Sequence, residues 1–353
     1  MTFDDVQGLK KALLEPIQEQ MRELTASAES AEPLRRDARM AVGYSRRGAA
    51  YGLEIRVGNK RGKAWRDAEA MRKRYPNEVN VIVVQSTEIP SSKAVQGEEP
   101  FSRRLLAKPD EEHPLCLGAS VSHRDSLASG SLGAFVRDEK DVISFLSCSH
   151  VIGLSGTAKK RDPVFHPGRR DVPQLNIANL VGSLAEATVL SRAGANTLDA
   201  GYAHVEEDVD YLGNVIPPGV GAPGDFEGKK LEYDPNVEFE QDMELAKVGR
   251  TTGYTVGLLN AFSLDNVSVS VPGIGLVFFD NCIEVRWRAV NQPFTKPGDS
   301  GALVFTVNKR KALGLHFAGG DVQREGRDLK VSYACQLSAI LSEYQFNLSW
   351  DEP

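Results

Sequence analysis

The sequence contains few cysteines and no long hydrophobic run. Its four cysteines, Cys116, Cys148, Cys282 and Cys335, are widely spaced and form no CxxC pair. This spacing excludes a disulfide framework and indicates reduced thiols in a cytoplasmic protein. No run of 18 apolar residues occurs, so we expect no membrane-spanning helix. The N-terminus lacks the basic start and apolar core of a secretory signal, which also favours the cytoplasm.

Metal-ligand patterns and an overall basic charge are also missing. The six histidines show no metal-ligand spacing, so we predict neither a metal site nor a cofactor. The formal net charge is −6 at pH 7, which argues against a nucleic-acid partner because such proteins are usually basic. One stretch, 45–75, is rich in Arg and Lys, and we interpret it as a solvated helix face.

The residues that are present indicate three regions. Residues 1–86 predict a small α+β unit, with helices at 4–25 and in GKAWRDAEAMRKRY, and strands in AVGYS, YGLEIRV and EVNVIVVQ. Residues 87–113 lack periodicity and are rich in Pro, Ser and charge, as a linker would be. Residues 114–345 consist of short β-branched runs separated by turn residues, which predicts a sandwich or barrels. A Pro/Gly-rich acidic segment at 206–244 joins two β units, and SAILSEYQFNL predicts a closing helix.

A serine lies between two glycines at the start of an apolar strand in PFTKPGDSGALVF. Ser300 is either part of a hairpin turn or a nucleophile. A nucleophilic serine needs a base and a third group that orients the base. His150 ends the apolar run ISFLSCSH, and Asp199 directly precedes the strand AGYAHV. The chain order His150, Asp199, Ser300 is one of the known orders of such a triad.

These motifs carry a family resemblance. GDSGALVF, SCSHVIG and LDAGYAHV resemble the nucleophile, histidine and aspartate motifs of trypsin/chymotrypsin-like serine peptidases. Together with SLGAFVRD and KVGRTTGYTVG they resemble, more narrowly, the bacterial trypsin-like proteins related to plant Narrow Leaf proteins. The resemblance covers roughly residues 115–340. It implies a mainly β fold, with two antiparallel Greek-key β-barrels (chymotrypsin-like) preceded by the small α+β N-terminal domain.

The resemblance also implies an oxyanion hole, but it does not identify the partner of Asp299. The backbone N–H groups of Gly298 and Ser300 are the expected oxyanion hole, because glycines permit the strained turn that aims them at one atom. Val151 replaces the half-cystine that normally follows the catalytic histidine, in agreement with a reducing compartment. In secreted members of the resembled family, a freshly cleaved N-terminus pairs with the aspartate that corresponds to Asp299. No IVGG-type start precedes the β region here, so the sequence does not identify the partner of Asp299.

A predicted specificity pocket involves Thr295, His316, Phe317 and Ala318. The strand ALGLHFAGG resembles the one that lines the pocket for the residue before the cut. A histidine there, with a threonine five residues before the nucleophile, is similar to glutamyl endopeptidases and picornaviral cysteine proteases. We expect a preference for Glu or Gln, since imidazole and hydroxyl groups can bind a buried carboxylate or amide. His316 as a core histidine is the alternative. Phe294 stands where trypsin-like enzymes carry Asp, which disfavours Lys or Arg.

The sequence therefore predicts an intracellular serine endopeptidase that acts on protein or peptide substrates. The alternative is a pseudo-protease, a peptide-binding module that acts as a scaffold. We expect the N-terminal domain to be regulatory or to dock a protein partner. Within Lys247–Gly253, Arg250 pairs either with an acidic substrate or with the acidic connection before it, and we favour the structural role. The linker contains Gln96–Gly97, a hypothetical self-cleavage site if the pocket accepts Gln.

Overall fold

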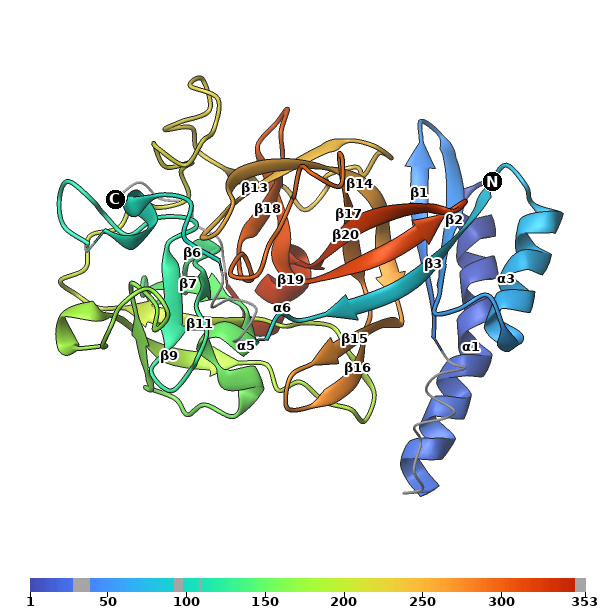
Figure 1. The fold of residues 1–353 in the computed structure, drawn as a ribbon, viewed down its shortest axis with the longest axis horizontal. Helices are drawn as coiled ribbons and strands as arrows, with labels where there is room; N and C mark the ends of the chain where they lie inside the picture. The colour runs from blue at the N-terminus through green and yellow to red at the C-terminus, as the bar shows by residue number, and fades with distance from the viewer. Residues whose placement is uncertain (28–38, 92–97, 108, 347–353) are drawn as a thin grey trace.

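The computed structural model describes residues 1–27, 39–91, 98–107 and 109–346 (Figure 1). Strands predominate, and the helices lie mainly at the N-terminal end of the molecule. The hypothetical cleavage site Gln96–Gly97 lies outside the described residues. No helix in the described part of the chain is both long and apolar enough to cross a bilayer.

The N-terminal unit contains the predicted helices and strands. The first helix begins one residue earlier and ends two residues later than its apolar stripe predicts. β1 and β2 form an antiparallel hairpin through Arg47 and Ala50, and β3 lies parallel to β2. The elements are α1 (Phe3–Ser27), β1 (Met40–Arg47), β2 (Ala50–Val57), α3 (Gly62–Arg74) and β3 (Val79–Glu88).

The first β unit is a closed Greek-key ring. Its hydrogen-bonded order is β5-β4-β8-β9-β11-β7-β6. β5 and β6 are parts of one extended segment, because Leu132 bonds to Ala119 on one side and Gly133 bonds to Leu146 on the other. The fourth strand of the ring thus lies beside the first, which is the Greek-key order. The strands are β4 (Ser120–His123), β5 (Gly130–Ser131), β6 (Ala134–Arg137), β7 (Ile143–Ser147), β8 (Pro163–Phe165), β9 (Leu180–Ala187) and β11 (Gly201–Val205).

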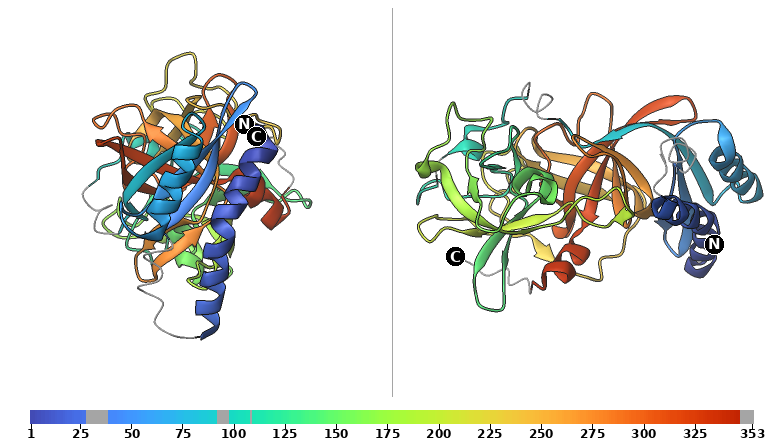
Figure 2. Two further views of the ribbon diagram at one scale, coloured as in Figure 1. Left: turned by 90° about the vertical axis from the view of Figure 1, so that its right-hand side faces the viewer. Right: turned by 90° about the horizontal axis from the view of Figure 1, so that it is seen from below.

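The second β unit repeats the same order. Each pair of neighbours in β13-β14-β17-β20-β19-β18 is antiparallel, and β18 pairs with β13, which closes the ring. The two rings lie side by side (Figures 1 and 2). This arrangement confirms the predicted mainly β fold with two antiparallel units. The strands are β13 (Glu244–Gly249), β14 (Gly253–Asp265), β17 (Cys282–Trp287), β18 (Leu303–Thr306), β19 (Lys311–Arg324) and β20 (Arg327–Gln336).

Shorter elements connect or cover the two rings. β15 and β16 form a hairpin between β14 and β17, and β10 joins its outer edge. The predicted closing helix is present as α6, which packs against β19 and β20. The acidic connection contains β12, and a 3-10 turn lies in the linker. These elements are η1 (Arg103–Leu106), α5 (Ser149–Ile152), η2 (Leu154–Gly156), η3 (Ile177–Asn179), β10 (Ala195–Asn196), β12 (Glu232–Tyr233), β15 (Val267–Val271), β16 (Gly275–Phe279) and α6 (Leu337–Tyr344).

The N-terminal strands belong to the same sheet as the second β unit. β1 pairs with β14, while β3 pairs with β19 through Glu88 opposite Gly319 and Ser86 opposite Asp321. In Figure 1, β3 runs from the helical end of the molecule toward β19 and α6. Residues 1–86 therefore contribute three strands to a continuous sheet.

A buried ionic cluster joins the N-terminal strands to the second β unit. Arg56 on β2 donates to the carboxylate of Glu284 on β17, with an Nη2–Oε1 distance of 2.6 Å. It also donates to Glu54 at 3.0 Å, and Asn80 donates to the same carboxylate at 2.7 Å. Arg56 is 2% exposed and Glu284 is fully buried. Removal of one partner from such a cluster leaves uncompensated charge in the interior, which is strongly destabilising.

We expect Arg56→Met to lower the free energy of unfolding by about 3–5 kcal/mol, because it leaves two buried carboxylates without their cation. Urea denaturation would measure the loss. Arg72→Met is the matched control, since Arg72 is exposed and its ion pair within the described residues is with its helical neighbour Glu69. The control should change stability little. Equal, small effects of the two substitutions would contradict a structural role for the cluster.

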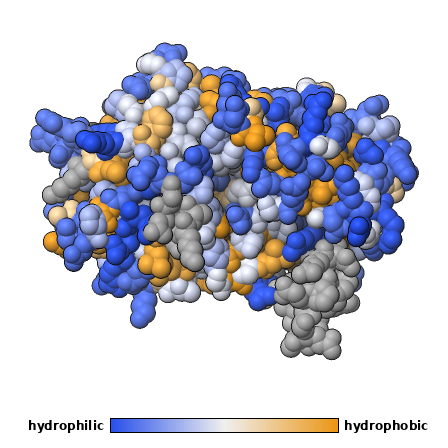
Figure 3. Space-filling model, in the orientation of Figure 1, coloured by the Kyte–Doolittle hydropathy of each residue, from blue (hydrophilic) through white to orange (hydrophobic). Residues whose placement is uncertain are grey.

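The outer surface shows no single large hydrophobic face in the view of Figure 3. Hydrophobic residues occur there in small groups between hydrophilic ones. The most exposed large hydrophobic side chains of the described residues, Ile177, Leu127 and Val189, lie in separate segments between strands. The face seen in Figure 3 therefore does not by itself indicate a docking site.

Candidate active site

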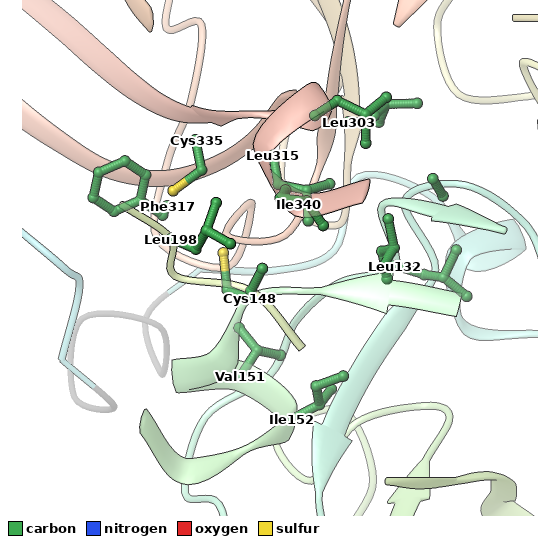
Figure 4. Packing of buried hydrophobic residues seen from close by; sticks show 14 of the residues in the cluster. Leu132, Cys148, Val151, Ile152, Leu198, Leu303, Leu315, Phe317, Cys335 and Ile340 are labelled. Atoms are coloured by element: carbon green, nitrogen blue, oxygen red, sulfur yellow. The ribbon is translucent and has the colours of Figure 1, made fainter. Parts of the chain in front are cut away.

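His150 lies where the first β unit meets the second. β7 ends at Ser147, and α5 begins two residues later, so His150 occupies a short helical turn. Figure 4 shows the hydrophobic packing at this junction, where Val151 and Ile152 of the turn point into the packed layer and Leu198 lies between Cys148 and Cys335. The side chain of His150 remains 13% exposed.

Asp199 holds His150 through two contacts. Its Oδ2 lies 2.5 Å from Nδ1 of His150, and its Oδ1 accepts the backbone N–H of His150 at 3.0 Å. Asp199 is fully buried, and its own N–H donates to Sγ of Cys335 at 3.2 Å. With Nδ1 bonded to a carboxylate, Nε2 is the nitrogen left to accept a proton from a nucleophile.

Ser300 lies on the turn before β18, against the segment that carries His150. Its carbonyl oxygen accepts the N–H of Ser131 at 2.7 Å, which ties the turn to the first β unit. A Cβ on Gly301 would lie 3.3 Å from the backbone N of Cys148, so the nucleophile turn directly adjoins the end of β7. Oγ of Ser300 forms no hydrogen bond with the described residues. Serine–histidine hydrogen bonds are often long in unliganded sites and shorten in the substrate complex.

The two predicted oxyanion-hole donors have no acceptor among the described residues. Neither the N–H of Gly298 nor that of Ser300 donates to another group in the described part of the chain. Gly298 has a φ of +101°, a conformation that side-chain-bearing residues rarely adopt. Both N–H groups are therefore available to a ligand atom, as a developing oxyanion requires.

The structure gives Asp299 a partner that the sequence left open. Nζ of Lys247 lies 3.4 Å from its Oδ2, and both groups are fully buried. Oδ1 accepts the N–H groups of Thr251 and Thr252 at 2.8 and 3.1 Å. Oδ2 accepts the hydroxyl of Thr252 at 2.7 Å and the N–H of Lys296 at 2.9 Å. Burial alone would raise the pKa of Asp299, but Lys247 and these donors outweigh it and hold the pKa below its usual value.

Lys247, Thr251 and Thr252 were missed as functional residues, although the segment Lys247–Gly253 stands out in the sequence. Arg250 in the same segment is 2% exposed and forms a bidentate pair with Asp171, which follows β8. The structural role favoured for Arg250 agrees with this pair. Its partner, however, comes from the first β unit and not from the acidic connection at 206–244.

Two of the predicted pocket residues, Thr295 and His316, form hydrogen bonds with successive residues of β20. Oγ1 of Thr295 lies 2.6 Å from Oγ of Ser332, and Nδ1 of His316 lies 3.1 Å from the carbonyl oxygen of Tyr333. Nε2 of His316 forms no hydrogen bond with the described residues, and the residue as a whole is 3% exposed. Burial lowers the pKa of His316 to about 4.

Phe317 and Ala318 differ from Thr295 and His316 because they offer no polar side chain. Both are fully buried, and the ring of Phe317 packs on Phe279 with centroids 4.6 Å apart. Any contact of these two residues with a substrate would therefore involve their backbone. Phe294 is also fully buried, in the core cluster beneath the N-terminal strands.

All four cysteines are free and buried. Burial raises the pKa of Cys148 well above its usual value, and its thiol donates to the carbonyl oxygen of His316 at 3.1 Å. Cys148, His150 and Asp199 each have an atom that could bind a metal ion, and these three atoms lie within 4.8 Å of one another. A protonated thiol that serves as a donor does not suit a metal ligand, which must be a thiolate.

No protein-family model matches the chain. A curated relative, protein NARROW LEAF 1 of Oryza sativa subsp. japonica, is 26% identical over 225 residues, covering 58% of this chain and 36% of the relative. The chain thus matches little more than a third of the rice protein's length.

Three solved structures are similar in fold. A glutamic acid specific serine protease, described as using a histidine triad in substrate binding, is 19% identical with a TM-score of 0.44, covering 66% of this chain and 100% of its own. Cellulomonas bogoriensis chymotrypsin is 17% identical with a TM-score of 0.41, covering 67% and 98%. Nocardiopsis protease is 16% identical with a TM-score of 0.44, covering 66% and 97%. At these identities and TM-scores the matches concern the fold and not the chemistry.

The ion pair of Asp299 and Lys247 predicts that a variant without Lys247 unfolds at a higher pH than the wild type. A carboxyl group whose folded pKa is depressed adds stability above its unfolded pKa, and this stability is lost as pH falls through the folded pKa. Lys247→Met removes the cation and raises the folded pKa of Asp299. We therefore expect acid unfolding to begin about 1–3 pH units higher than in the wild type, as measured by fluorescence between pH 2 and 7.

The control for this measurement is Lys311→Met. Lys311 pairs with Glu232 at the surface, so its loss removes the same charge without affecting a buried carboxylate. An acid transition of Lys247→Met at the pH of the wild type would show that Lys247 does not set the pKa of Asp299.

Proposed function

We propose that the chain is a serine endopeptidase in which Ser300 is the nucleophile, His150 the general base and Asp199 the group that orients His150. The observation that carries the proposal is the 2.5 Å contact between His150 Nδ1 and Asp199 Oδ2, beside the turn with Ser300. The substrate is a protein or peptide, and the reaction needs no cofactor.

The reaction proceeds through an acyl-enzyme. Oγ of Ser300 attacks the carbonyl carbon while Nε2 of His150 takes the hydroxyl proton. The N–H groups of Gly298 and Ser300 donate to the resulting oxyanion, and one such donor contributes about 3–4 kcal/mol to lowering the barrier. The C–N bond breaks as His150 returns the proton to the leaving amine. Water then attacks the ester by the same route, which releases the acid and regenerates Ser300.

The free thiols support intracellular action. Four buried, unpaired cysteines suit a reducing compartment better than an oxidising one. We include intracellular action in the proposal on this ground.

Substitutions of the triad test the proposed reaction. Ser300→Ala and His150→Ala should lower kcat on a cleaved peptide by about 10⁶-fold, and Asp199→Asn by about 10⁴-fold through the wrong histidine tautomer. Ser270→Ala and His113→Ala are matched controls at exposed positions. Wild-type turnover in Ser300→Ala would overturn the mechanism. Peptide binding without turnover in the wild type would instead identify a scaffold of the pseudo-protease kind.

The pocket supports a preference for Gln or Glu before the cut. Nδ1 of His316 faces a carbonyl oxygen, which can only accept, so Nδ1 carries the proton when the ring is neutral. Nε2 is then an acceptor, which matches the amide N–H of Gln. A Glu carboxylate binds there only if His316 takes up a proton.

This proton uptake predicts a pH-dependent choice between the two substrates. Because the pKa of His316 is about 4 in the free protein, the ratio of kcat/KM for Glu to that for Gln should fall as pH rises above 4. The expected slope is at most about tenfold per pH unit. Any pH effect on the steps that the two substrates share cancels in the ratio. Paired peptides that differ only at this residue, assayed between pH 5 and 8, measure it.

His316→Ala should remove the preference and leave cleavage after small apolar residues nearly unchanged. His204→Ala is the matched control, because His204 lies on β11 and bonds to Ser144. A peptide library that shows a basic or large aromatic residue before the cut would contradict the assignment of the pocket.

A further inference from the structure

The hairpin turn between β13 and β14 contacts the backbone of the nucleophile turn as well as Asp299. Residues 250–252 form the turn, with Gly249 opposite Gly253 in the hairpin register. Beyond the contacts with Asp299, Oγ1 of Thr251 donates to the carbonyl oxygen of Pro297 at 2.8 Å. Pro297 directly precedes Gly298, the first predicted oxyanion-hole donor.

The direction of this hydroxyl bond is fixed by a second contact. Nη1 of Arg250 donates to the same Oγ1 at 2.9 Å. A guanidinium can only donate, so Thr251 must accept there, and its single proton is left for Pro297. Arg250 itself is held by its pair with Asp171. The hydroxyl of Thr251 is thus an oriented donor and not a free rotor.

The carbonyl of Pro297 and the N–H of Gly298 belong to one peptide group. This group is planar and trans, because His166–Pro167 is the one cis bond among the described residues. In a trans peptide the C=O and the N–H point in opposite directions. A contact that holds the Pro297 carbonyl toward Thr251 therefore holds the Gly298 N–H on the opposite side.

Without such a contact the peptide group could rotate. Gly298 carries no side chain and has φ +101°, so its backbone can adopt more than one orientation. After rotation the carbonyl oxygen would face the position of the oxyanion and repel it. The second donor is fixed differently, since the carbonyl of Asp299 accepts the backbone N–H of Ala302 at 3.0 Å. Among the described residues, Thr251 supplies the side-chain contact to the Pro297 carbonyl.

We infer that Thr251 is a positioning residue of the proposed peptidase, which holds the Gly298 N–H in the orientation that binds the oxyanion. This inference rests on the proposed function. Thr251 does not touch the substrate, so it acts on the transition state and not on substrate binding. Its hydroxyl, and not its methyl group, carries the effect.

The test compares Thr251→Ser with Thr251→Ala in the full chain, because the two variants differ by one hydroxyl group. Thr251→Ala should lower kcat by about 10–10²-fold, below the loss of 10²–10³ found when an oxyanion donor is removed outright. Its KM should change less than about twofold. Thr251→Ser should keep kcat within about threefold of the wild type.

A peptide boronic acid supplies a second readout, since its tetrahedral adduct with Ser300 places an oxygen in the oxyanion position. Its inhibition constant should weaken in Thr251→Ala by the same factor as kcat/KM, as expected for a transition-state analogue. Thermal unfolding shows whether each variant remains folded. If Thr251→Ala does not, Thr251→Val, which keeps the volume, replaces it in a comparison with the wild type.

The outcomes separate this inference from the proposed function. A wild-type chain that neither hydrolyses peptides nor binds the boronic acid refutes the proposed peptidase. An active wild type with equal kcat in Thr251→Ser and Thr251→Ala refutes the positioning role alone. A loss confined to KM or to thermal stability also refutes it, because a merely structural contact would produce that pattern.

Discussion

One buried carboxylate, that of Asp299, fixes the geometry on which the candidate active site depends. A charge in the interior is tolerated only when it is paired and hydrogen-bonded. Lys247 supplies the pairing charge, and the turn at Thr251 and Thr252 supplies donors from backbone and side chain. Gly298 and Ser300 flank Asp299 in the sequence. Their N–H groups donate to no described residue.

The cation that pairs with Asp299 comes from Lys247 and not from a chain terminus. In secreted trypsin-like enzymes a freshly cleaved N-terminus pairs with the equivalent aspartate. Here the cation lies on β13, within the same β unit as Asp299, so it is in place once that unit has folded. This contact therefore needs no cleavage. The N-terminal unit instead contacts this β unit through β3, which pairs with β19 and places Glu88 opposite Gly319, three residues beyond His316.

The sequence predicts the fold and the contact of His150 with Asp199 because those features have local signals. Alternating apolar runs and turn residues mark the strands, and His150, Asp199 and Ser300 each lie beside a strand end. The partners of Asp299 and Arg250 had no such signal, since Lys247 is 52 residues from Asp299 in the sequence and Asp171 is 79 residues from Arg250. Pairing between residues so far apart in the sequence depends on how whole strands and turns pack together, which no local pattern encodes. The pairing of β3 with β19 was missed for the same reason.

The most direct test of the central claim, that His150 and Asp199 activate Ser300, is covalent labelling with a fluorophosphonate. The reagent reacts with activated serines and leaves ordinary hydroxyl groups unmodified. We predict one adduct per wild-type chain, localised to Ser300 by peptide mass spectrometry, with strongly reduced labelling of His150→Ala. Absence of an adduct on the folded wild-type chain, or an adduct at a different serine, would contradict the account.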